Sequence, residues 1–130
     1  MATYLHTMYR ITDPERSRAF YEALGMELRR DMDIVRNGDR EATNYFFGFP
    51  GQDEELELTL NHDGRGYDLG TGYGHVAIEV DDAARACDAV RAKGGTVTRE
   101  AGPVKGGTTV IAFVQDPDGY KIELIERKAA

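Results

Sequence analysis

The stretch that decides the fold is GYGHVAIEVDD, residues 72–82, where a histidine opens a run that alternates between apolar residues and small or acidic ones. Such alternation predicts a half-buried strand, because successive side chains of a strand point to opposite faces. A second histidine opens a similar run near the start of the chain, LHTMYRITD at residues 5–13. Together the two stretches suggest that the chain contains two copies of one unit.

A shift of 69 residues relates a strand-opening histidine, a helix-capping aspartate and a helix-ending glycine in the two copies: His6 and His75, Asp13 and Asp82, Gly25 and Gly94. Aspartate before a helix satisfies its first free N–H groups, and glycine tolerates the conformation that ends it. Each predicted helix is followed by runs with strand composition, NYFFGF and ELELTLN in the first half, TTVIAFVQD and YKIELIE in the second. Each half is therefore expected to contain a strand, a helix and two or three further strands.

We predict a single domain over residues 1–130, made of repeat modules at about 1–62 and 72–128 with a glycine-rich linker at 63–71. The stretch DMDIVRNGDREA, residues 31–42, is interpreted as a loop that makes the first half longer. A small curved sheet covered by one helix leaves its other face open. The open faces must therefore meet another surface.

The composition limits the partners. The chain has 130 residues, a formal charge of -7 and a pI near 4.9, which would repel nucleic acid and anionic membrane surfaces. No apolar run approaches the roughly 20 residues that span a bilayer, and the first residues lack a basic region followed by an apolar one, so we expect a cytoplasmic protein. The single cysteine, Cys87, is expected to be a buried helix residue without a catalytic role.

Each predicted half offers one histidine on its first strand and one glutamate on its last: His6 and Glu57, then His75 and Glu123. Two imidazoles and two carboxylates suit a divalent first-row metal. A histidine at a strand start is often a hydrogen-bonded rim residue, and a glutamate in an alternating strand often faces solvent. Because both residue types recur in both halves, a metal site is weighed equally with these structural roles. His62 has no counterpart and is interpreted as a linker or rim residue, with substrate contact as the minor alternative.

The stretches LHTMYR, ELTLN, GYGHVAIEVDDAARAC and GGTVTREAGPVKGGTTVIAFVQDPDGYKIELIE resemble glyoxalase I (lactoylglutathione lyase) of the short bacterial type, within the vicinal oxygen chelate superfamily. The resemblance implies an α+β fold of two tandem βαβββ modules, the glyoxalase/bleomycin-resistance fold, with half-barrels paired in a homodimer. It also implies one divalent metal per site at the subunit interface, held by residues matching His6, Glu57, His75 and Glu123.

The activity that the resemblance implies is a carbon-sulfur lyase reaction that detoxifies methylglyoxal. The hemithioacetal of methylglyoxal and glutathione is isomerised through an enediolate to S-D-lactoylglutathione. Glu123 would move the proton, with Glu57 as ligand and possible assistant. By the same resemblance, Arg10 and Asn61 would contact the γ-glutamyl part of glutathione, and Lys105 would lie in the segment that closes over the glycyl carboxylate.

The metal and the competing activities stay open in the sequence. The longer, zinc-preferring form of the family has an arginine shortly before its second histidine, whereas this chain reads GTGYGH there. One carboxylate contact is therefore expected to be missing or supplied elsewhere. Because the chain shows neither the N-terminal extension nor the extra loops of that longer form, it resembles the forms that prefer nickel, so nickel is expected, with cobalt and zinc as alternatives. Competing members of the superfamily are a thiol transferase acting on fosfomycin, an extradiol dioxygenase and a non-enzymatic drug-binding protein. A set of four donors argues against the last two, and the sequence does not identify the physiological thiol.

Overall fold

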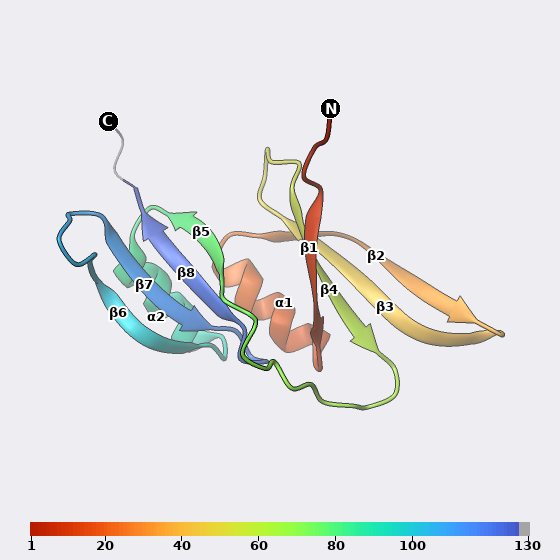
Figure 1. Cartoon of the computed structure of the whole chain (residues 1–130). Coiled ribbons are helices and arrows are strands. Elements are labelled where there is room, and N and C mark those ends of the chain that lie inside the picture. The colour runs from red at the N-terminus through yellow and green to blue at the C-terminus, as the bar shows by residue number, and fades with distance from the viewer. Residues whose placement is uncertain (128–130) are drawn as a thin grey trace. The chain divides into compact units, whose positions relative to one another are not determined.

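A computed structural model of the chain describes residues 1–127 and divides the protein into two compact units, Met1–Asp68 and Leu69–Ala130. The last residue of the predicted second module, 128, lies outside the described residues. The elements of the first unit are β1 (His6–Ile11), α1 (Pro14–Ala23), β2 (Glu27–Arg36), β3 (Asp39–Gly48) and β4 (Glu55–Asn61). Those of the second are β5 (Val76–Val80), α2 (Ala83–Ala92), β6 (Thr96–Pro103), β7 (Val110–Gln115) and β8 (Lys121–Glu126) (Figure 1).

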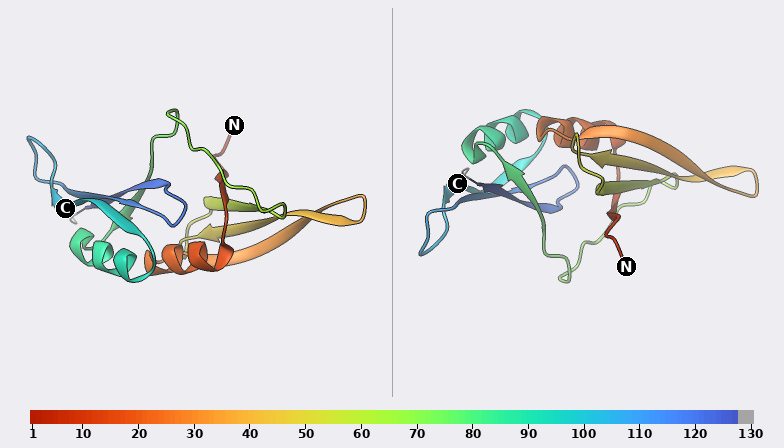
Figure 2. Two further views of the ribbon diagram at one scale, coloured as in Figure 1. Left: turned by 90° about the horizontal axis from the view of Figure 1, so that it is seen from below. Right: turned by 90° about the horizontal axis from the view of Figure 1, so that it is seen from above.

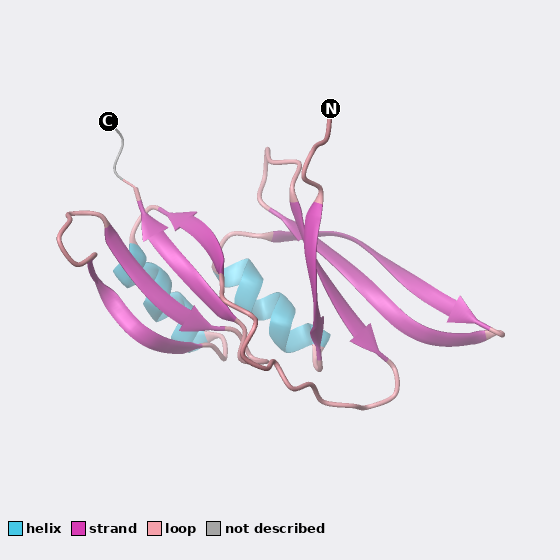
Figure 3. Ribbon diagram, viewed as in Figure 1, coloured by secondary structure: helices cyan, strands magenta, loops and turns pink. Residues whose placement is uncertain are grey.

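Both units have the order strand, helix, strand, strand, strand, so the predicted α+β class with two βαβββ modules is confirmed. The first sheet runs β1-β4-β3-β2 and the second β5-β8-β7-β6. In each sheet the first and last strands of the module pair in parallel, and the other pairs are antiparallel. The segment between β4 and β5 contains neither helix nor strand (Figure 3).

The two helices begin and end as their sequences predict. Asp13 and Asp82 are extended, with φ of -144° and -147°, and their side chains accept hydrogen bonds from N–H groups two or three residues further on. Gly25 and Gly94 follow the helices with φ of +101° and +87°, in the left-handed region. Each helix has 10 residues. Among residues 1–127, no helix is long and apolar enough to cross a membrane.

Each helix lies on one face of its own sheet (Figure 2). In the first unit the Tyr21 hydroxyl of α1 lies 2.5 Å from that of Tyr9 on β1, and its ring centroid lies 6.1 Å from that of Phe47 on β3. In the second unit Cys87 and Val90 of α2 are buried. The sheet residues buried in the second unit are Ile78, Ala112, Val114, Ile122 and Leu124. The opposite face of each sheet therefore carries the other half of the alternating pattern.

The interpretation of residues 31–42 as a loop is wrong. These residues belong to the hairpin of β2 and β3, two strands of 10 residues each that turn at Asn37 and Gly38 (Figure 1). Both turn residues have positive φ, 52° and 82°, which matches the right-handed twist of the flanking strands. Asn-Gly is the strongest short hairpin signal in a sequence, so the pattern for this element was present.

Candidate metal and substrate site

A histidine and a glutamate lie in contact within each unit, on the sheet face opposite the helix. His6 Nε2 is 3.0 Å from Glu57 Oε1, and His75 Nε2 is 3.2 Å from Glu123 Oε1. The exposed fractions of the side chains are also alike, 40% and 12% in the first pair, 41% and 18% in the second. Both histidines are thus open to solvent, whereas both glutamates are largely covered.

The parallel pairing of the first and last strands explains why the same contact forms twice. Met8 is the register partner of Glu57, and Ala77 is the register partner of Glu123. In both units the histidine therefore lies two residues before the partner of the glutamate, on the same face of its strand. His75 comes directly before β5, so both histidines occupy the start of a first strand.

Backbone and aromatic contacts fix the segment that carries His75. The Tyr73 hydroxyl donates to the carbonyl of Lys121 at 3.0 Å, and the Tyr73 ring centroid lies 5.5 Å from that of Tyr120. Burial, with the nearby Asp116 charge, raises the pKa of Tyr73 to about 12. Tyr73 is therefore a neutral donor that ties the entry to β5 against the start of β8.

The donor separations fit two neighbouring ligands of one metal ion. Ligand atoms about 2.0–2.1 Å from a metal lie about 2.8–3.4 Å apart at octahedral or tetrahedral angles. The observed 3.0 Å and 3.2 Å fall in that range. Imidazole and carboxylate donors also suit a first-row divalent ion.

Each unit supplies one histidine and one glutamate as potential metal ligands. Within residues 1–127, no group of three or more histidine, cysteine, aspartate or glutamate side chains is placed to hold a metal ion. A four-donor site therefore requires the first pair to meet the second, and the convergence of His6, Glu57, His75 and Glu123 stays a prediction.

An aromatic ring that the sequence patterns did not single out lies beside each pair. Phe46 on β3 makes an edge contact with His6, with ring centroids 6.2 Å apart, and Phe113 on β7 does the same with His75 at 5.5 Å. A signal existed, because both rings lie in the strand that precedes the one carrying the glutamate.

A cation lies over each of these rings. Arg30 Cζ is 4.0 Å from the Phe46 centroid, and Lys121 Nζ is 4.9 Å from the Phe113 centroid. Arg30 also forms ion pairs with Glu55, whose side chain is 13% exposed. The hydrogen bonds from Arg30, assisted by Arg29, hold the pKa of Glu55 below its usual range although burial opposes them. Positive charge therefore borders both donor pairs.

The predicted substrate-binding residues lie at three separate places. Arg10 is exposed on the same face of β1 as His6, about 13 Å further along the strand. Asn61 ends β4, and its Nδ2 donates to the Tyr67 hydroxyl at 2.7 Å. Lys105 is exposed in the turn between β6 and β7, in the other unit.

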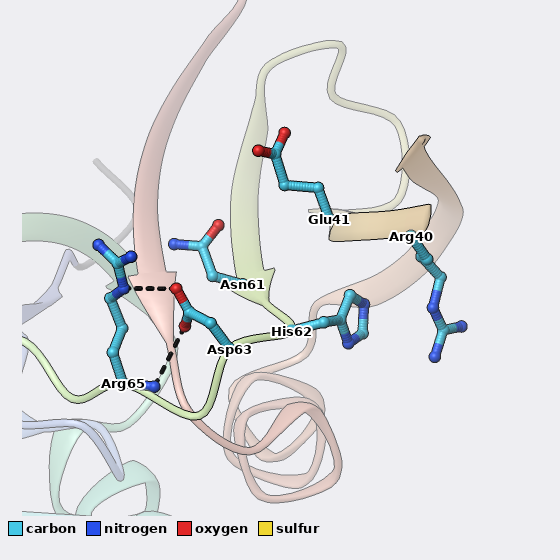
Figure 4. Close-up of a pocket in the computed structure, with 6 residues that line it drawn as sticks. All are labelled: Arg40, Glu41, Asn61, His62, Asp63 and Arg65. Carbon is cyan, nitrogen blue, oxygen red and sulfur yellow. Dashed lines mark hydrogen bonds and ion pairs between the residues drawn. The ribbon is translucent and has the colours of Figure 1, made fainter. Parts of the chain in front are cut away.

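A pocket of about 420 Å³ opens around the end of β4 (Figure 4). Its lining residues are Arg40, Glu41, Asn61, His62, Asp63 and Arg65. Asp63 accepts hydrogen bonds from Arg65 Nε at 2.6 Å and from the Arg65 backbone N–H at 3.2 Å. The backbone hydrogen bond from Arg65, followed by its guanidinium, lowers the pKa of Asp63. Cationic and anionic groups therefore share this pocket.

His62, predicted as a linker or rim residue, is hydrogen-bonded on the rim of this pocket. Thr43 Oγ1 donates to Asp33 Oδ1 at 2.7 Å and lies 2.7 Å from His62 Nε2. Because the single hydroxyl proton goes to Asp33, His62 Nε2 is the donor to Thr43. This geometry makes His62 a structural link between β4 and the β2–β3 hairpin.

Cys87 lies apart from these features. Its side chain is buried in α2, and burial raises the pKa of the thiol. A buried, protonated thiol is a poor nucleophile. The expected burial of Cys87 in a helix is confirmed.

The fold and the paired donors define a class of protein. The chain belongs to the Glyoxalase/Bleomycin resistance protein/Dioxygenase superfamily, whose family model matches residues 3–124. A lactoylglutathione lyase of Escherichia coli O157:H7 is 56% identical over 129 residues, with 97% of this chain and 93% of that protein covered. One of Haemophilus influenzae is 55% identical over 128 residues, with 96% and 93% covered.

Solved structures extend the likeness to the backbone. Glyoxalase I from Zea mays is 46% identical and superposes with a TM-score of 0.86 over 98% of this chain. This chain spans about 45% of the length of that maize protein. The trypanothione-dependent glyoxalase I of Leishmania major is 36% identical, with a TM-score of 0.79 over 96% of this chain and 86% of that one. The predicted glyoxalase/bleomycin-resistance fold is confirmed.

Proposed function

We propose that this chain is a lactoylglutathione lyase that isomerises the hemithioacetal of methylglyoxal and glutathione to S-D-lactoylglutathione. The observation that carries the proposal is the pair of equivalent His–Glu contacts, His6 with Glu57 and His75 with Glu123, on a chain more than half identical to proteins of that name. The reaction class is a carbon-sulfur lyase acting in methylglyoxal detoxification, and the proposed compartment is the cytoplasm.

The four donors would hold one divalent metal per site, with nickel preferred and cobalt or zinc as alternatives. The metal supplies Lewis-acid stabilisation of the negative charge that develops on the two substrate oxygens. A homodimer would bring His6 and Glu57 of one chain to the second pair of the other chain, and this closes the open sheet faces.

Glu123 would take the proton from the carbon that carries sulfur and return it to the neighbouring carbonyl carbon. Its carboxylate is largely covered, with 18% of the side chain exposed, so few waters compete for the proton between the two steps. Phe113, the cross-strand partner of Glu123, would supply part of the apolar cover. Glu57 occupies the equivalent place in the first unit and would serve as a ligand.

The thiol partner would extend along β4 from the metal towards Asn61. Glutathione carries two carboxylates and one ammonium group, so its γ-glutamyl head is a zwitterion. The pocket that Asn61 shares with Arg40, Glu41 and Arg65 offers charges of both signs, which suits such a head. Arg10 would contribute a second cation, and Lys105 would meet the glycyl carboxylate.

The first test measures turnover of the hemithioacetal before and after the metal is removed with a chelator. The metal-free protein is expected to be inactive, and nickel is expected to restore more activity than zinc. Full activity without metal would overturn the proposal, whereas better recovery with zinc would overturn the choice of metal alone. Persistent inactivity after loading would favour the fosfomycin thiol transferase or another superfamily activity, each of which has its own assay.

The second test locates the site. His6→Ala and His75→Ala are each expected to be inactive, but a refolded mixture should recover roughly a quarter of the activity. Half of the dimers would then be mixed, and each mixed dimer would keep one intact site. No recovery, in a mixture shown to exchange subunits, would mean that both histidines of a site come from one chain.

A further inference from the structure

Two phenylalanines occupy equivalent places beside the donor pairs, and the proposed reaction gives them no role as ligands. The Phe46 ring meets the His6 imidazole at an interplanar angle of 86°, and Phe113 meets His75 at 72°. Edge-to-face contacts of this kind are favoured over a direct face-to-face arrangement at such separations. Each ring therefore limits how its imidazole can rotate.

The register of the sheets places the same rings directly against the glutamates. Phe46 is the cross-strand partner of Glu57, and Phe113 is the cross-strand partner of Glu123. Side chains at directly opposed antiparallel positions have Cβ atoms about 5 Å apart. One ring in each unit thus contacts the histidine and lies beside the glutamate of a pair.

The cations over the rings come from different strands in the two units. Arg30 reaches Phe46 from β2, whereas Lys121 reaches Phe113 from β8. Arg99 occupies the register place in the second unit that Arg30 has in the first, but its guanidinium donates to backbone carbonyls, Ile111 among them. The two units therefore place a cation over the ring from different strands. The phenylalanine ring itself is the feature that both units share.

We propose that Phe46 and Phe113 are positioning residues that hold the imidazoles of His6 and His75 in the orientation that binds metal. The inference rests on the metal site of the proposed function. A fixed imidazole loses less rotational freedom when the metal binds, so the ring increases metal affinity without touching the ion. The cation on the ring restricts the ring in turn.

The expected effect is modest and specific. An edge-to-face aromatic contact corresponds to roughly a twofold to tenfold change in an equilibrium constant. Phe46→Leu and Phe113→Leu are each expected to weaken nickel binding about threefold to tenfold, because leucine keeps apolar volume but provides no flat wall for the imidazole.

Neighbouring residues supply matched controls. Phe47 is adjacent to Phe46 but is buried on the opposite, helix-facing side of β3, at 2% exposure. Phe47→Leu should lower the thermal unfolding temperature and leave nickel affinity within about twofold. Val114→Ala is the equivalent control for Phe113, since Val114 is fully buried on the helix face of β7.

The experiment measures nickel affinity by competition with a chromogenic chelator, in the absence of substrate, together with the visible absorption of the cobalt-loaded protein. Weaker binding and an altered cobalt spectrum in both ring variants, but in neither control, support the proposal. Unchanged affinity in either ring variant, or an equal loss in its control, overturns it. Should Phe46→Leu fail to fold, the comparison of Phe113→Leu with Val114→Ala decides. Turnover of the hemithioacetal is assayed separately, so failure of the proposed activity is distinguished from failure of this inference.

Discussion

The two units carry the same residue types at equivalent positions on the open face of their sheets, but different residue types on the face that the helix covers. On the open face each unit has a histidine, a glutamate and a phenylalanine at equivalent register places. On the helix face the first unit buries Phe20 and Tyr21, whereas the second buries Cys87 and Val90. The metal binding that we propose for the open face would require particular donor atoms, but a core requires only apolar volume that fills its space. The open face is therefore the constrained one.

A second difference lies in the hairpin after each helix. β2 and β3 have 10 residues each, whereas β6 has 8 and β7 has 6. The longer hairpin accounts for two of the three residues by which the glutamate spacing, 66, falls short of the histidine spacing, 69, and the loop before β4 accounts for the third. An insertion at the far end of a hairpin leaves the registered part unchanged, so the donor pairs keep their geometry.

Replacing each glutamate in turn tests whether the two equivalent glutamates have different roles, and it should have the largest effect. Glu123→Gln is expected to lower kcat about 10²- to 10⁴-fold, since it removes the carboxylate that we propose moves the proton. Glu57→Gln should cost less in kcat, because an amide oxygen can still act as a ligand. Steady-state assays with elemental analysis of each variant check this. A larger loss from Glu57→Gln at equal metal content would reverse the roles.

The difference between the helix faces predicts unequal losses of stability. Phe20→Ala should lower the free energy of unfolding by about 3–5 kcal/mol, as removal of a buried aromatic ring leaves a large cavity. Val90→Ala removes two carbons and should cost about 1.5–3 kcal/mol. Urea titration followed by circular dichroism compares them. Equal losses would show that the two cores are packed to the same extent.

A substrate contact made from a strand should contribute more to binding than one made from an exposed turn. Arg10 projects from β1, whereas Lys105 lies in an exposed turn. Arg10→Ala is expected to raise KM for the hemithioacetal about tenfold, since the charged hydrogen bond that we propose for Arg10 would be lost. Lys105→Ala should raise KM only about twofold to threefold, as for an exposed ion pair. A larger effect at Lys105 would indicate that the turn closes tightly over the substrate.

Acid should affect the first unit through Glu55. Hydrogen bonds from Arg30 lower the pKa of Glu55 from its ordinary 4.5, so the folded state binds this proton less readily than the unfolded state. The stabilisation is complete above the unfolded pKa and is lost as pH falls through the folded pKa. The unfolding temperature of Glu55→Gln should therefore fall less steeply below about pH 5. Parallel curves for both proteins would contradict the shift.

Alkali should affect the second unit through Cys87. Burial raises the pKa of its thiol above the ordinary 9.0, so its contribution to stability is complete below that value and is lost as pH rises towards the folded pKa. Cys87→Ala should remove this part of the alkaline decline, whatever its effect at neutral pH. The same thiol should react with an alkylating reagent only as the protein unfolds. Rapid modification of the native protein would contradict burial as the cause.

The sequence alone was sufficient for features that local chemistry decides. The helix caps at Asp13 and Asp82 follow from residue types, and six of the eight strands within residues 1–127 follow from alternation, whereas β2 and β6 are not assigned. The repeated histidine and glutamate follow from comparing the two halves. The hairpin turn at Asn37 and Gly38 had the same kind of signal but was interpreted as part of a loop. Apart from the comparison of the two halves, these features depend on neighbours within a few residues along the chain.

Only the tertiary structure decided which side chains meet across strands. The diagonal contact of each histidine with its glutamate, the placement of Phe46 and Phe113 beside them, and the choice of Arg30 and Lys121 as the cations over the rings depend on register. A shift of one residue in register would turn each of these side chains to the opposite face. Register is set by the packing of the whole sheet against its helix, and that is a property no single stretch of sequence carries.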